Sequence, residues 1–212
     1  EKEEYVKMLV DEIRNCPDTV QNYRVISIFF GGGTPSLLTG EQIGRLMDTV
    51  REIFTLDEDA EITVEMNPGT VTEEKLRKYR QAGVNRLSIG LQSVNDEELR
   101  LLGRIHTYEE FREAYHLARA NGFSNINVDL ISAIPGQTVE SWRRTLEQVM
   151  ALSPEHISAY SLILEEGTTF YKKYVEDEAK EGPKLPDEDA ERQMYWDTET
   201  LMEKNGYHRY EI

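Results

Sequence analysis

Five short runs rich in β-branched and aromatic residues are spaced along the chain, and each has the length of a single strand. They span residues 25–30, 61–66, 86–92, 126–131 and 157–162. Amphipathic helical patterns separate them. Strands that alternate with helices in this way predict an α/β fold with a parallel sheet.

Polar residues with helix-capping character precede several of the helical patterns. Thr39 and Thr107 are each followed, three residues later, by Gln or Glu, as in a capping box where the two side chains satisfy unpaired backbone amides. Asn95 and Asp187 can cap in the same way. We therefore expect helices to begin directly after these four residues.

Three consecutive predicted strands have one apolar face and one polar face. In 86–92 the leucines and the isoleucine share one face and Ser88 and Gln92 the other, and 61–66 and 126–131 alternate likewise. A central strand of a doubly wound sheet is apolar on both faces. The pattern therefore favours a barrel whose interior holds a polar ligand, and the alternative is that the polar residues pair with one another in a packed interior.

A glycine triplet, Gly31-Gly32-Gly33, follows the first predicted strand and leads into Thr34-Pro35. The segment fits neither the dinucleotide-binding fingerprint nor a P-loop, because the later glycine and lysine of those motifs are missing. Glycines at this position let the backbone approach a ligand closely. A plain tight turn is the alternative.

Three polar side chains stand at or near the ends of predicted strands. Glu65, Gln92 and Asp129 lie on the polar faces at the carboxyl ends, where barrel proteins place their functional groups. Arg104 adds a guanidinium group, whose paired N–H donors match the two oxygens of a carboxylate. With the glycines, these residues predict a binding site at the barrel opening for a ligand that carries hydroxyls, an ammonium and a carboxylate, although for any one strand-end residue taken singly a structural role is the favoured interpretation.

Composition and charge narrow the function classes. The 212 residues include 40 acidic and 24 basic ones, so a nucleic-acid partner is not expected. No apolar run has the length of a membrane span and no signal peptide opens the chain, so we expect a cytoplasmic protein without an integral membrane segment. The single cysteine, Cys16, excludes an internal disulfide and an internal cysteine-ligated cluster.

The motifs together resemble those of radical S-adenosylmethionine (SAM) enzymes of the oxygen-independent coproporphyrinogen III oxidase family. Residues 29–36, Phe-Phe-Gly-Gly-Gly-Thr-Pro-Ser, resemble the family's second-strand motif, in which the glycine segment meets the methionine part of SAM. Residues 61–70, 85–93 and 127–131 resemble the next strands in order. The resemblance implies a partial parallel (β/α)6 radical SAM barrel that lacks its first strand and its cluster loop.

Carried over residue by residue, the resemblance implies SAM contacts but no catalytic residue and no metal ligand in this chain. The SAM contacts would be Gly32, Gly33, Thr34, Glu65, Gln92, Arg104, Asp129 and Ile163. Members of the family hold a [4Fe-4S] cluster on a CxxxCxxC loop. We expect those cysteines upstream of residue 1, so that residues 1–212 are a barrel core truncated at both ends.

Two branches of the family are consistent with the sequence. Residues 65–70, 90–93 and 102–106 resemble the branch of heme-chaperone-like proteins, which bind heme and pass it to other proteins. The other branch converts coproporphyrinogen III to protoporphyrinogen IX by SAM-radical oxidative decarboxylation. An alternative of another class is an α/β barrel that binds some other polar metabolite without radical chemistry.

The main hypothesis is therefore a role in porphyrin or heme metabolism on the heme-chaperone-like branch. It implies SAM, a [4Fe-4S] cluster in the full-length protein and heme as cofactors. Porphyrinogen or heme would be the small-molecule partner, and heme-accepting proteins the macromolecular one. The full-length protein would be a radical SAM oxidoreductase, whereas residues 1–212 alone are expected to be inactive.

Overall fold

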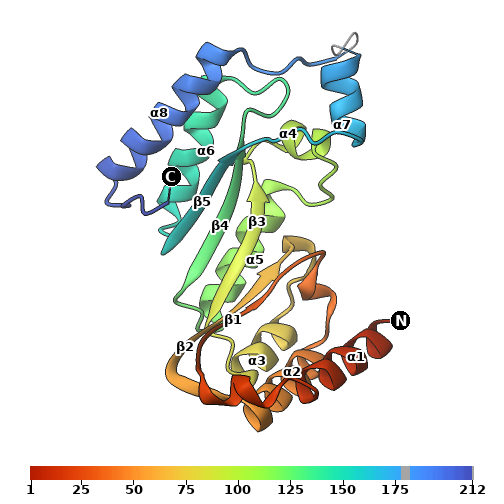
Figure 1. Ribbon diagram of the computed structural model, residues 1–212. Coiled ribbons are helices and arrows are strands. Elements are labelled where there is room, and N and C mark those ends of the chain that lie inside the picture. The colour runs from red at the N-terminus through yellow and green to blue at the C-terminus, as the bar shows by residue number, and fades with distance from the viewer. Residues whose placement is uncertain (178–181, 212) are drawn as a thin grey trace. The chain divides into compact units, whose positions relative to one another are not determined.

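The structure, a computed structural model, describes residues 1–177 and 182–211 (Figure 1). The chain forms two compact units. Residues 1–90 and 112–127 make the first unit, and residues 91–111 and 128–212 make the second. The eight residues predicted to contact SAM fall equally between them, with Gly32, Gly33, Thr34 and Glu65 in the first and Gln92, Arg104, Asp129 and Ile163 in the second.

The sheet follows the order of the chain. Its strands pair in the order β1-β2-β3-β4-β5, and the β1–β2 and β2–β3 pairs are parallel. Such an order is that of a barrel wall, whereas the order of a doubly wound sheet reverses at a switch point. The predicted α/β fold and partial parallel barrel are confirmed. The strands are β1 (Arg24–Phe30), β2 (Thr55–Met66), β3 (Arg86–Gln92), β4 (Ile126–Ser132) and β5 (His156–Ser161).

Two strands form the edges of this sheet. Among the described strands, β1 and β5 each pair on one side only. On β1 the side chains of Ile26 and Phe29 are 70% and 58% exposed. An edge strand carries a row of backbone N–H and C=O groups without a strand partner on its outer side.

Strand β2 is longer than the sequence predicts, because it begins at Thr55 and not at residue 61. The sequence does not predict this first half because it contains Asp57, Glu58 and Asp59, and acidic residues are depleted in strands. The half is nevertheless paired: Thr55 lies opposite Arg24, and the register shifts between Val25 and Ser27.

In the first unit, helix α1 (Lys2–Arg14) packs against α2 (Gly40–Ile53), and α2 packs against α3 (Glu73–Ala82). Helix α2 begins as predicted, because Thr39 and Gln42 form a complete capping box. Its Ile43 and Met47 are buried, one turn apart on one face, as expected of an amphipathic helix that covers a core.

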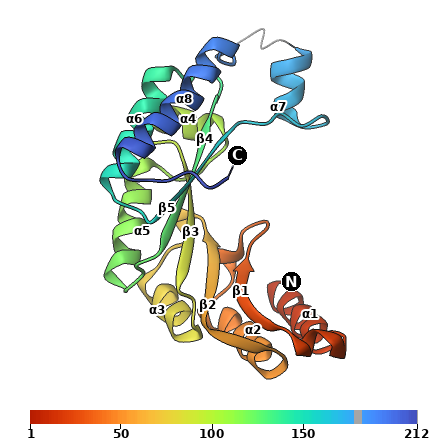
Figure 2. The same ribbon diagram turned by 60° about the vertical axis from the view of Figure 1, so that its left-hand side comes forward.

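Helices of the second unit are α4 (Asp96–Leu101), α6 (Val139–Ala151), α7 (Thr169–Tyr171) and α8 (Glu188–Lys204); α5 (Tyr108–Ala120) spans both units. Helices α6 and α8 lie side by side (Figure 2). The buried Trp142 of α6 links the two helices, because its Nε1 donates to Met194 O at 3.2 Å and to Thr198 Oγ1 at 2.9 Å on α8. Asn95 and Asp187 cap α4 and α8 as predicted.

Polar side chains that lie before the carboxyl ends of the strands pair with one another. Asn127 Nδ2 donates to Ser88 Oγ at 2.7 Å, and both residues are buried. Arg86 Nη1 donates to the buried Thr63 Oγ1 at 3.4 Å. For these residues the packed-interior alternative holds, and the polar residues at the strand ends carry the case for a ligand site.

Candidate functional site

The glycine loop after β1 and the carboxyl end of β2 meet in the first unit. The backbone N–H of Gly32 donates to Glu65 Oε2 at 3.1 Å. Gly32 adopts a φ of +107°, a conformation that side-chain-bearing residues rarely take. The structure therefore brings Gly32 and Glu65 together, as the sequence analysis predicts.

Gly31 is a glycine because the space around its Cα is already filled. A Cβ built there would stand 2.5 Å from Cε1 of the Phe29 ring and 3.3 Å from Cδ of Glu65. At Gly33, by contrast, an added Cβ would meet nothing within 4 Å. Because Gly31 has no side chain, Glu65 can lie beside the loop.

Gly31→Ala should weaken this arrangement and Gly33→Ala should not. The half-exposed Phe29 ring can swing aside, so we expect Gly31→Ala to cost about 1 kcal/mol and lower the melting temperature by about 2–4 °C. Thermal unfolding followed by circular dichroism measures the difference. Equal melting temperatures for the two variants would contradict the close packing of Gly31 against Phe29 and Glu65.

A half-buried set of hydrogen bonds, here called the clamp, ties the glycine loop to the turn after β2. Ser36 Oγ accepts from Thr70 Oγ1 at 2.7 Å and from the backbone N–H of Asn67 at 3.1 Å. Lys75 Nζ donates to the carbonyl oxygens of Ser36 at 2.6 Å and Thr70 at 2.9 Å. Burial, reinforced by the charge of Lys2, lowers the pKa of Lys75. This clamp is not evident in the sequence, because each of its residues is common in turns.

In the second unit, the last residue of β3 is strained and has an unsatisfied acceptor. Gln92 is only 8% exposed, and its φ of +75° is unfavourable for any residue other than glycine. Its buried Oε1 has no hydrogen-bond partner among the described residues. Strain and an unsatisfied buried acceptor are both costly, and they are typical of functional sites.

His106 lies next to this strand end. The ring is 4% exposed, and Nε2 is 3.2 Å from the carbonyl oxygen of Leu91. Burial lowers the pKa of His106, with Leu91 opposing the shift. Because a carbonyl can only accept, Nε2 is the donor in this contact. The backbone partner at Nε2 agrees with a structural role for His106, whereas its buried Nδ1 has no hydrogen-bond partner among the described residues.

Arg104 and Asp129 are close enough in the second unit to interact electrostatically. Burial lowers the pKa of the Arg104 guanidinium, whereas Tyr160 and Asp129 act in the opposite direction. Ile163 follows the end of β5, and 80% of its surface is exposed. The structure thus places the predicted Arg104 and Asp129 near each other and leaves Ile163 as an accessible apolar side chain.

A buried carboxylate that the sequence analysis did not single out joins the turns after β3 and β4. Glu98 is 6% exposed. Its Oε2 accepts from Ser93 Oγ at 2.6 Å and from Gln137 Nε2 at 2.9 Å. Its Oε1 accepts from Ser141 Oγ at 2.9 Å and from Asn95 Nδ2 at 3.5 Å. In the sequence, Glu98 resembles any acidic residue in the first turn of a helix.

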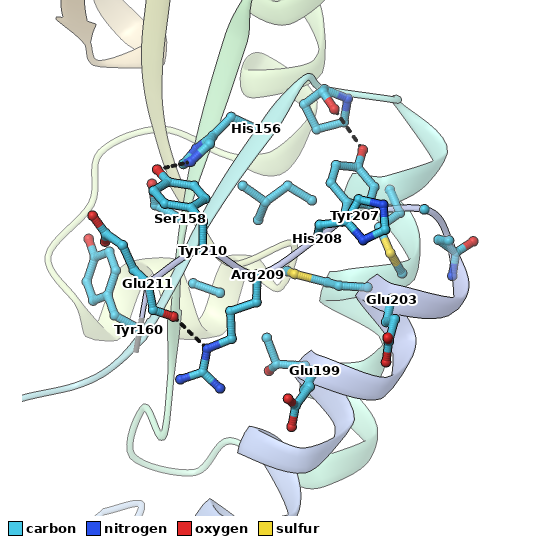
Figure 3. Close-up of a pocket in the computed structure, with 18 of the residues that line it drawn as sticks. His156, Ser158, Tyr160, Glu199, Glu203, Tyr207, His208, Arg209, Tyr210 and Glu211 are labelled. Carbon is cyan, nitrogen blue, oxygen red and sulfur yellow. Dashed lines mark hydrogen bonds between the residues drawn. The ribbon is translucent and has the colours of Figure 1, made fainter.

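A cavity of about 1380 Å³ also lies in the second unit, between β5, α6, α8 and residues 205–211 (Figure 3). His156 Nε2 and Tyr210 Oη are 2.6 Å apart on one side of it, and Tyr207 Oη donates to Pro154 O at 2.8 Å on another. Arg209 contributes a cation. Of the described residues that line this cavity, none belongs to the predicted SAM set, although Tyr160, which lines it, interacts electrostatically with Arg104.

The described part of the chain shows no cluster of potential metal ligands. Within residues 1–177 and 182–211, no three histidine, cysteine, aspartate or glutamate side chains group closely enough to hold one. The sequence has a single cysteine, which cannot supply the three thiolates of a radical SAM cluster. In the same ranges, no helix is both long and apolar enough to cross a bilayer.

Comparison with known proteins gives consistent matches. The family model described as the radical SAM superfamily matches residues 1–149. The heme chaperone HemW of Escherichia coli is 40% identical over 209 residues, which are 99% of this chain and 53% of that protein. HemW of Haemophilus influenzae is 40% identical over 94% of this chain and 50% of its own length.

A solved structure of coproporphyrinogen III oxidase (HemN) from Escherichia coli, described in its title as a radical SAM enzyme, is also similar. It superimposes with a TM-score of 0.84 at 31% identity, over 97% of this chain and 46% of that protein. The chain thus spans about half the length of the curated relatives that it matches.

Proposed function

Since this chain belongs to the radical SAM superfamily, we propose that it is the barrel part of a heme chaperone that binds SAM and heme and delivers heme to other proteins. The observation that carries the proposal is the 40% identity to heme chaperones across nearly the whole chain, against 31% to the oxidase structure. The motifs at 65–70, 90–93 and 102–106 support the same branch.

SAM fits the residues of the chain. In the first unit, Glu65 would anchor polar groups of SAM, with Gly32, Gly33 and Thr34 as backbone contacts. In the second, Gln92 Oε1 would accept from a SAM donor, and Arg104 beside Asp129 would serve its carboxylate. Two features support this: the acceptor at Gln92 lacks a partner among the described residues, and a Cβ added at Gly32 would meet nothing within 4 Å. Bound SAM is the source of the radical chemistry that names the superfamily.

The [4Fe-4S] cluster does not fit these 212 residues, because they contain one thiolate where three are needed. What this chain's own residues do, in the proposal, is bind and orient SAM, and a heme-accepting protein is the partner to which heme would pass.

Heme binding without porphyrinogen turnover is the expected behaviour. The protein expressed from its complete coding sequence and reconstituted anaerobically should give a Soret band on titration with hemin. In the presence of SAM and a reductant it should leave coproporphyrinogen III unchanged, which chromatography of the oxidised porphyrins measures. Vinyl-bearing products would instead favour the oxidase branch, and absence of both heme binding and SAM binding would favour a barrel for another metabolite.

A further inference from the structure

We propose that Glu98 is a positioning residue that holds the turns after β3 and β4 in the shape that SAM requires. The inference rests on the proposed function, because it assumes that Gln92, at the first of these turns, contacts SAM. Glu98 would act through its neighbours and would not touch SAM itself.

The hydrogen bonds of Glu98 join segments that are distant in sequence. Ser93 and Asn95 belong to the turn that connects β3 to α4, and they lie on either side of its bend. Gln137 belongs to the turn after β4, and Ser141 to the first turn of α6. Each Glu98 oxygen receives one donor from each of the two segments, so the carboxylate fixes one turn against the other.

Both turns contain strained backbone. Gln92 has a φ of +75° and Ala133 a φ of +59°, and both residues directly follow or end a strand. Such conformations persist only where surrounding contacts hold them. Gln137 supplies one such contact at Ala133, because its Oε1 accepts from the neighbouring Ile134 N–H at 3.4 Å while its Nε2 is held by Glu98.

The chain of contacts therefore reaches the candidate ligand site at one end. Ser93 donates to Glu98 and accepts from the backbone N–H of Asn95 at 3.0 Å, which fixes the backbone directly after Gln92. The unsatisfied Oε1 of Gln92 then has a defined position, and a defined position is what a ligand donor needs. A carboxylate used only to cap α4 would require neither Gln137 nor Ser141.

Burying a carboxylate is costly, and the cost is offset only when its oxygens are well satisfied. Glu98→Gln changes one acceptor oxygen into a donor that faces Gln137 Nε2 or a serine hydroxyl. At metal sites, removing a partner that orients a ligating side chain commonly costs about 10–100-fold in affinity, and Glu98 would orient Gln92 in a comparable way. We therefore expect Glu98→Gln to raise the Kd for SAM by about tenfold or more.

Glu97→Gln is the matched control. It lies one residue away in the same helical turn and makes the same change of charge, but Glu97 is exposed. It should leave the Kd for SAM unchanged. The measurement is isothermal titration of SAM into protein expressed from its complete coding sequence and reconstituted with its cluster, with melting temperatures recorded for every variant.

A reciprocal exchange separates positioning from general stabilisation. Glu98→Gln together with Gln137→Glu restores an amide facing a carboxylate, so SAM affinity should return to within a few-fold of the wild type. Restored stability without restored affinity would reduce Glu98 to a structural residue and overturn the inference, as would unchanged affinity in Glu98→Gln. Failure of the wild-type protein to bind SAM would overturn the proposed function itself.

Discussion

Residues 1–212 expressed alone should stay colourless and carry no [4Fe-4S] cluster after anaerobic treatment with iron and sulfide. A radical SAM cluster needs three thiolates, and this chain has only Cys16, which follows helix α1. Absorbance near the cluster bands, iron and sulfide content, and electron paramagnetic resonance after reduction measure the outcome. Since bidentate chelation of an iron by SAM would also be lost, SAM should bind roughly a hundredfold or more weakly than in the full-length protein.

The control is the protein expressed from its complete coding sequence, which should become brown under the same treatment and cleave SAM when reduced. A stoichiometric cluster signal from residues 1–212 would show that the chain holds iron by ligands other than a cysteine triad. That result would place the chemistry within residues 1–212 and not on an upstream cysteine loop.

Glu65→Ala should have the second large effect, a loss of SAM affinity. The substitution removes the acceptor of the Gly32 N–H together with the proposed anchor for a polar group of SAM. Hydrogen bonds to a charged group contribute about 1.5–3 kcal/mol, so we expect the Kd to rise by about 10–100-fold. Isothermal titration with SAM in the cluster-reconstituted protein measures it.

Glu61→Ala controls for the loss of a carboxylate from the same strand. Glu61 lies on the same face of β2 as Glu65, four residues before it, and its side chain is 48% exposed beside Arg86. Removing it should leave SAM binding unchanged, because it lies away from the carboxyl end of the strand. An equal loss of affinity in both variants would point to a general effect of charge and against an anchor at Glu65.

Much of the fold could be predicted because local signals and tertiary structure agree. The alternation of apolar and polar residues in 86–92 gives β3 with its bounds, and Thr39 begins α2 through the expected capping box. The first half of β2 was missed because its pairing with β1 overrides the low strand propensity of Asp57 to Asp59. In such cases a partner strand, which the local sequence does not reveal, decides the structure.

The candidate site was predictable only in part. Strand-end position indicated Glu65 and Gln92, and the structure places Glu65 against the glycine loop. Glu98 was not predictable, because its role comes from Gln137 and Ser141, about forty positions further along the chain. The strain at Gln92 is also invisible in the sequence, since glutamine carries no preference for a positive φ.

The two edge strands of the sheet have a consequence for handling the isolated chain. Strands β1 and β5 each offer an outer row of backbone groups, and β1 adds the exposed Ile26 and Phe29. Such edges are templates for pairing with other chains. Concentrated solutions of residues 1–212 would therefore be prone to self-association and precipitation through strand addition, which dilute samples or a charged substitution at Ile26 would suppress.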